Sequence, residues 1–198
     1  RWAADGDEMA RVFAAAGAQV TREFYINDRG VQMDKFGMSL EASALGLPVP
    51  EGGYHGEYIH DIARQIVADD PSILDLPSDA RWEAFREAGY LLQLQEQKDV
   101  LDNFRTHFDV WYSERSLHTT GAVDRGMALL RSQGHVFEQD GAVWLRTTDF
   151  DDDKDRVLLK ADGELTYFAS DTAYYVDKRN RGFDICIYLL GADHHGYV

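Results

Sequence analysis

Apolar positions recur with helical spacing at the start of the chain, over residues 2–16. The apolar members follow the i, i+3, i+4, i+7 spacing of one face of a helix: Trp2, Met9, Val12, Phe13 and Ala16. Gly17 follows as a helix C-terminal stop, and residues 19–26 have the β-branched and aromatic composition of a strand. A helix followed by a strand is half of a β–α–β unit. We therefore expect the first strand of that unit to precede residue 1, so that the chain begins inside a fold.

The middle of the chain predicts mainly helices. Residues 46–56 are rich in glycine and proline and indicate a turn. A short amphipathic helix is expected after them, ending at Pro71, and Ser78 is a suitable N-cap for a long helix. Residues 108–112 then indicate a second strand, and an amphipathic helix follows around residues 123–130.

Between residues 134 and 168, the apolar positions recur with a period of two residues. Short runs at residues 136–137, 142–145 and 157–159 are typical of strands, and turn residues join them. We interpret residues 134–168 as a small β-rich antiparallel insertion within a single domain that takes in residues 1–198.

The last predicted elements are a helix over residues 170–179 and an apolar strand over residues 185–190. That strand has the continuous apolar pattern of a central parallel strand buried on both faces. Strands that alternate with helices indicate an α/β fold, an incomplete doubly wound (Rossmann-type) parallel sheet with the antiparallel insertion added. Ligands in such sheets bind beyond the carboxyl ends of strands, so the polar residues 191–196 are a candidate site.

Composition and charge narrow the class of protein. The chain is 44% hydrophobic and 28% charged, as in ordinary globular proteins, and it has no apolar run long enough to cross a bilayer. A single cysteine, Cys186, cannot form an internal disulfide and is expected in the core, which favours a cytoplasmic protein with no membrane partner. The net charge of −15 argues against nucleic-acid binding, although Lys178, Arg179 and Arg181 form a local basic cluster.

Three polar residues follow the predicted last strand: Asp193, His194 and His195. Carboxylate and imidazole suit zinc or iron, but adjacent residues rarely point at one ion and no second cluster supplies further ligands. A nucleotide or substrate site is favoured instead, in which Gly191 lets a ligand approach the backbone and Asp193 accepts from hydroxyl groups. A polar turn that only ends the strand is the alternative.

Further charged positions have structural and functional interpretations. Asp171 would cap the predicted helix at its start, or would pair with a cationic ligand beside Tyr167, and spacing alone does not separate these readings. The basic cluster at the end of that helix suits the helix dipole first and phosphate second. The acidic run of residues 149–155 lacks the glycine and glutamate of an EF-hand and is expected to be a solvated hairpin tip with local ion pairs.

Several common catalytic patterns are absent from these 198 residues. No P-loop is present, no Gly-x-Gly-x-x-Gly follows a strand, and no serine, histidine and aspartate stand in a triad order. Their absence argues against P-loop hydrolases and ordinary dehydrogenases.

Several collinear segments resemble bacterial arginyl-tRNA synthetases, which are class I aminoacyl-tRNA synthetases. They are residues 22–33 (REFYINDRGVQM), 53–59 (GYHGEYI), 144–150 (WLRTTDF), 152–158 (DDKDRVL), 162–163, 166–171 (TYFASD) and 191–197 (GADHHGY). The resemblance extends along the whole chain in the order of the family. It implies part of the catalytic domain of a ligase that activates arginine with ATP, magnesium being expected with the ATP, and transfers it to tRNA-Arg.

The resemblance also implies roles for individual residues. Tyr167, Asp171 and His194 match the arginine pocket of the family. Gly191, Asp193 and His195 match the region that meets the ribose and base of ATP. No catalytic side chain, no protein-bound metal and no tRNA-contacting surface is assigned by the match.

The two signature motifs of the family are absent from this sequence. The family's His-x-Gly-His motif would precede residue 1, and its Lys-Met-Ser-Lys-Ser type loop would follow residue 198. Because these motifs hold the ATP phosphates, we expect the chain to be inactive alone. Two alternatives stay open: a non-catalytic arginine- or nucleotide-binding module derived from this fold, and a different nucleotide-binding fold that transfers an adenylyl group elsewhere.

Overall fold

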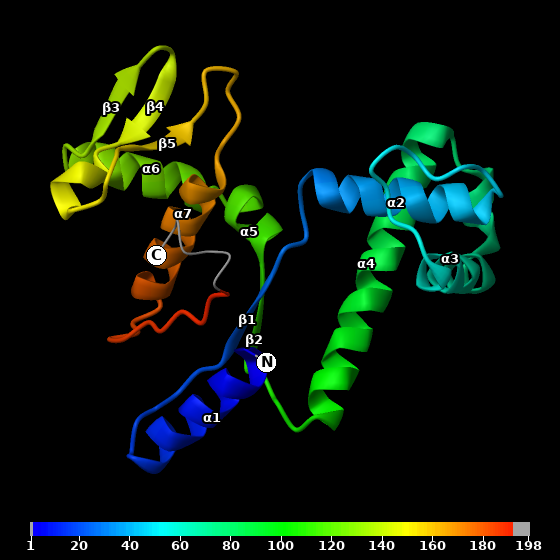
Figure 1. The fold of residues 1–198 in the computed structure, drawn as a ribbon, viewed down its shortest axis with the longest axis horizontal. Coiled ribbons are helices and arrows are strands. Elements are labelled where there is room, and N and C mark those ends of the chain that lie inside the picture. The colour runs from blue at the N-terminus through cyan, green and yellow to red at the C-terminus, as the bar shows by residue number, and fades with distance from the viewer. Residues whose placement is uncertain (1, 192–198) are drawn as a thin grey trace. The chain divides into compact units, whose positions relative to one another are not determined.

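The computed structural model describes residues 2–191 and divides the chain into two compact units. Residues 1–26 and 110–198 belong to the first, which we call the α/β unit, and residues 27–109 form the second, the helical unit. Each unit has its own hydrophobic core. Figure 1 shows the elements of both.

The α/β unit begins with helix α1 (Trp2–Ala15) and strand β1 (Glu23–Ile26). Strand β1 pairs in parallel with β2 (Val110–Ser113), and Tyr25 lies opposite Tyr112 in the register. Both segments that were predicted as strands therefore form strands, and the two pair in parallel. Strand β2 leads directly into the short helix α5 (Glu114–Thr119), which the sequence analysis did not predict.

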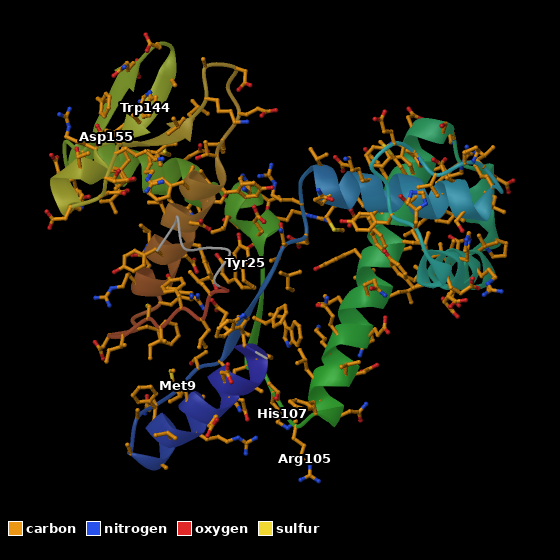
Figure 2. The ribbon with its side chains drawn as sticks, viewed as in Figure 1. Met9, Tyr25, Arg105, His107, Trp144 and Asp155 are labelled. Atoms are coloured by element: carbon orange, nitrogen blue, oxygen red, sulfur yellow. The ribbon has the colours of Figure 1, made fainter. Side chains whose placement is uncertain are left out.

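Helix α6 (Ala122–Ser132) and the last helix, α7 (Tyr167–Asn180), flank a three-stranded antiparallel sheet in the chain order. The sheet has the order β3 (Val136–Gln139), β4 (Ala142–Leu145), β5 (Arg156–Leu159), as the period-two pattern predicted. The 3-10 turn η2 (Thr147–Phe150) stands between β4 and β5. Figure 2 marks Trp144 on this sheet.

The core of the α/β unit joins both sheets to helix α7. Leu117, Leu158 and Ala173 are among its buried members. The Tyr174 ring packs against those of Tyr25 and Tyr112, with centroids 4.8 and 4.7 Å apart. Figure 2 marks Tyr25 at this position. Because aromatic pairs at this separation add to the stabilisation from burial, the three tyrosines fix α7 over the parallel strands.

The helical unit consists of α2 (Val31–Ala44), α3 (Glu57–Asp69), the 3-10 turn η1 (Pro71–Asp75) and α4 (Ser78–Asn103). Its core contains Leu40, Ile59 and Phe85, all almost fully buried. Helices α2 and α4 approach closely where Gly89 faces Leu40 and Phe36. A β-carbon at Gly89 would lie 2.9 Å from Phe36 Cε1, so only glycine fits there without movement.

Three expectations from the sequence are wrong in the described residues. Residues 185–190 were predicted to form a buried central strand, but they pair with no strand and Ile185 is 77% exposed. A parallel strand needs a hydrogen-bonded neighbour, and neither edge of β1–β2 supplies one to this segment. Cys186, in the same segment, is only partly buried rather than a core residue. Ser78 is the first residue of α4, and Pro77 holds the N-cap position.

Candidate functional site

Helix α7 carries the two candidate arginine-binding residues that the structure describes, Tyr167 and Asp171. Thr166 caps the helix and accepts a hydrogen bond from the Ala169 amide at 3.4 Å. Its hydroxyl also donates to the Val157 carbonyl of β5 at 2.7 Å. The start of α7 is thereby tied to the antiparallel sheet, so Asp171 is not the cap that the structural interpretation expected.

One exposed face of α7 presents the candidate residues. Tyr167 is the first helical residue and is 72% exposed, and Asp171 follows one turn later, also exposed. Tyr175, one further turn along, is 50% exposed. Side chains four residues apart lie on the same side of a helix. The structure therefore brings Tyr167 and Asp171 together on one surface, with an aromatic ring on either side of the carboxylate.

The chain turns back after α7, and residues 183–191, which we call the returning segment, run beside the end of that helix (Figure 1). The Tyr188 ring centroid lies 4.0 Å from Lys178 Nζ, and Leu189 lies against Gly6 of α1. Burial raises the pKa of Tyr188 to about 12, and the negative charges near it, Asp171 among them, add to the increase. Lys178 lies two helical turns after Asp171, so Tyr188 packs against the side of α7 that carries Asp171.

A charged cluster lies behind the exposed face of α7, centred on Glu23 of β1. The Glu23 carboxylate accepts hydrogen bonds from Arg181 at 2.7 and 3.1 Å and one from the Tyr174 hydroxyl. Lys178 Nζ lies 3.9 Å from the same carboxylate. Burial opposes the charge of Glu23, but the hydrogen bonds from Arg181 and Tyr174 outweigh it, and the pKa of Glu23 lies below its ordinary value.

The basic cluster at the end of α7 therefore has partners within the α/β unit. Lys178 and Arg181 form ion pairs with Glu23. Arg179 donates hydrogen bonds to the carbonyl groups of Phe183 and Asp184, both at 2.8 Å. These contacts favour the structural interpretation of the cluster over phosphate binding. Sequence reasoning missed Glu23 because a glutamate in a strand-like segment carries no spacing signal toward residues more than 150 positions later.

The acidic run forms local ion pairs, as predicted. Asp152 receives two hydrogen bonds from Arg156, at 2.8 and 2.7 Å, and these lower the pKa of Asp152. Asp155 accepts from the amide and hydroxyl of Thr148, and Figure 2 marks its position at the sheet. Within residues 2–191, no group of three or more histidine, cysteine, aspartate or glutamate side chains is arranged to hold a metal ion.

The structure describes one of the remaining candidate residues. Gly191 is described and partly buried at the end of the returning segment. Asp193, His194 and His195 lie outside the described residues.

The helices of the described part include none that is long and apolar enough to span a membrane.

No family model matches the chain. Two similar solved structures are of aminoacyl-tRNA synthetases. One from Campylobacter jejuni, assigned as an arginyl-tRNA synthetase, aligns with 98% of this chain and 44% of that chain, with a TM-score of 0.87 and 31% identity. The Thermus thermophilus arginyl-tRNA synthetase aligns with 86% of this chain and 31% of that chain, with a TM-score of 0.57 and 25% identity.

Curated relatives point to the same family. Arginine–tRNA ligases of Renibacterium salmoninarum and Frankia alni are 58% and 57% identical to this chain over 198 residues. Those residues are all of this chain and 36% of each relative, so the chain spans about a third of their length. The predicted resemblance is confirmed: the chain is homologous to arginyl-tRNA synthetases along its whole length.

Proposed function

We propose that this chain is part of the catalytic domain of an arginine–tRNA ligase and contributes its arginine-binding surface. The proposal is supported by the homology along the whole chain and by one observation of the structure, the exposed Asp171 carboxylate between Tyr167 and Tyr175 on α7. The proposed fold is an incomplete doubly wound parallel sheet, of which β1 and β2 are neighbouring strands. Residues 134–168 are its β-rich insertion.

The proposed site suits a guanidinium group. A guanidinium is a planar fork whose parallel N–H groups meet both oxygens of a carboxylate, whereas a lysine ammonium is a point charge. Asp171 would accept those hydrogen bonds, and the ring of Tyr167 would pack on the flat face or the stem of the ligand. Cation–π contact with such a ring favours a cation as well.

The proposed reaction has two steps. The arginine carboxylate attacks the α-phosphorus of ATP, which arrives with magnesium, and pyrophosphate leaves with the broken P–O bond. A hydroxyl of the terminal ribose of tRNA-Arg then attacks the activated carbonyl, and AMP leaves. Neither step needs a protein nucleophile, so the contribution of this chain is to position arginine. Gly191, Asp193 and His195 are proposed to meet ATP, and His194 is proposed to complete the arginine pocket.

Calorimetric titration of the chain with arginine tests this proposal. Asp171→Asn removes the charge while keeping the size of the side chain, and we expect a loss of about 10- to 100-fold in arginine affinity, since hydrogen bonds between charged groups contribute about 1.5–3 kcal/mol. Asp124→Asn, an exposed carboxylate on α6, is the matched control and should leave the affinity unchanged. Equal affinities of the parent chain and the Asp171 variant would remove Asp171 from the site.

Activity is tested separately. We expect no charging of tRNA-Arg by these 198 residues alone, because the two signature motifs that hold ATP phosphates are not among them. Charging by the isolated chain would contradict that expectation. Arginine binding without any charging in a longer product of the same gene would favour the non-catalytic binding module.

A further inference from the structure

Three segments of the α/β unit meet at one charged cluster. Glu23 comes from β1, Lys178 and Arg181 come from the end of α7, and Tyr188 comes from the returning segment. The Glu23 side chain is 10% exposed and that of Lys178 is 14% exposed. Charges this far removed from water are costly unless they are paired, so their mutual placement is strongly determined.

Lys178 connects Glu23 to the returning segment. Its ammonium nitrogen lies 4.2 Å from the centroid of the Tyr174 ring and 4.0 Å from that of Tyr188, so that it contacts two aromatic rings. Burial lowers the pKa of Lys178, and the charge of Glu23 works against that decrease. Cation–π contacts strengthen when the cation is desolvated, as it is here.

The returning segment depends on such side-chain contacts. No strand among the described residues pairs with residues 185–190. Arg179 holds the beginning of the segment through the carbonyl groups of Phe183 and Asp184. Beyond that point, Tyr188 contacts Lys178 of α7, and Leu189 lies against Gly6 of α1.

We propose that Glu23 is a positioning residue for the arginine site: through Lys178 it holds Tyr188, and with it residues 185–191, against the side of α7 that carries Asp171. This inference rests on the proposed arginine-binding function. Glu23 itself does not touch the ligand. Glu23 acts by fixing the position of residues 185–191, which end at Gly191, the candidate ATP-binding residue.

The inference is tested with Glu23→Gln and two substitutions at Tyr188. Tyr188→Phe keeps the ring over Lys178, whereas Tyr188→Leu removes it. Glu164→Gln is the matched control for the loss of charge, because Glu164 pairs with Lys160 at 2.8 Å in an exposed contact. The first readout is the NMR shift of the Lys178 side-chain protons next to nitrogen, which two facing rings move upfield. The second is the dissociation constant for arginine.

We expect Glu23→Gln and Tyr188→Leu to move the Lys178 resonances toward their free-chain position and to weaken arginine binding about tenfold. Tyr188→Phe and Glu164→Gln should change neither readout. Because Tyr188→Leu leaves Glu23 paired, it tests the link even where Glu23→Gln does not fold.

Two results would overturn the inference. One is an unchanged Lys178 resonance in both Glu23→Gln and Tyr188→Leu, and the other is a moved resonance with unchanged arginine affinity. A parent chain that binds no arginine would refute the function proposed above, and this inference with it. If the parent chain binds arginine and the Glu23 and Tyr188 variants bind it with the same affinity, the positioning role alone is refuted.

Discussion

Arg181 donates to both oxygens of the Glu23 carboxylate, at 2.7 and 3.1 Å, across 158 positions of sequence. This pair joins the first strand of the α/β unit to the end of its last helix. Since the Arg181 side chain is 30% exposed and that of Glu23 is 10% exposed, the pair is partly shielded from solvent and its two-point geometry is well defined.

The first prediction concerns acid stability. The folded state lowers the pKa of Glu23 below its ordinary value of 4.5, so the stabilisation is present above that value and is lost as the pH falls through the lower, folded value. The free energy of unfolding should therefore fall below about pH 4.5, and Glu23→Gln should reduce this fall. At neutral pH, Glu23→Gln should lower the free energy of unfolding by about 1–2 kcal/mol. This is less than the loss of a fully buried ion pair would cost. Urea unfolding at several pH values measures both. An equally steep fall in the variant would contradict the role of this pair.

A second prediction compares two helical glycines. Gly89→Ala places a methyl group 2.9 Å from Phe36 and should destabilise the helical unit by about 1–3 kcal/mol, the usual cost of overpacking. Gly126→Ala is the control, because its β-carbon would lie at an ordinary 3.5 Å from that of Ala173. That change should be neutral or stabilising by up to about 1 kcal/mol, since alanine favours a helix. Thermal unfolding followed by circular dichroism measures both, and a stable Gly89 variant would contradict the close approach of α2 and α4.

The third prediction concerns the exposed apolar side chains of the returning segment. Ile185 is 77% exposed and Ile187 is 48% exposed, on a segment whose backbone pairs with no described strand. Unpaired extended segments of this kind promote association. We expect the chain to self-associate with rising concentration, and the double variant Ile185→Lys, Ile187→Lys to stay monomeric. Sedimentation velocity distinguishes these outcomes. A parent chain that stays monomeric throughout would contradict the prediction.

Local patterns predicted the elements that depend on local chemistry. The period-two pattern of residues 134–168 predicted strands β3, β4 and β5, because turns and cross-strand pairs set their register. The glycine stop after α1 and the strand-like composition around Tyr25 were likewise sufficient. Helix α2 was not predicted. Its buried face contains Phe36 and Leu40 at helical spacing but also Gly37 and Ser39, whose burial results from packing against α4 and the Tyr54 loop and could not be read from the pattern.

Long-range relationships could not be predicted from the pattern. The apolar run of residues 185–190 has the composition of a buried strand, yet a strand forms only where a partner is available. Glu23 carries no sign of its contacts with Lys178 and Arg181 in the sequence. In the candidate site, the helix was predicted to begin at residue 170, and the structure instead begins α7 at Tyr167, which places Tyr167 and Asp171 on the same helix. Their role in binding arginine came from the family resemblance and stays a prediction.

The central claim, that the Asp171 carboxylate binds a guanidinium, is tested most directly by comparing arginine with citrulline. Citrulline has nearly the shape of arginine but no charge, so the ratio of the two dissociation constants isolates the charged contact. Calorimetric titration of the parent chain should give a strong preference for arginine, about 10- to 100-fold, and Asp171→Asn should reduce the ratio to near one. An arginine preference that survives unchanged in the Asp171→Asn variant would contradict the account.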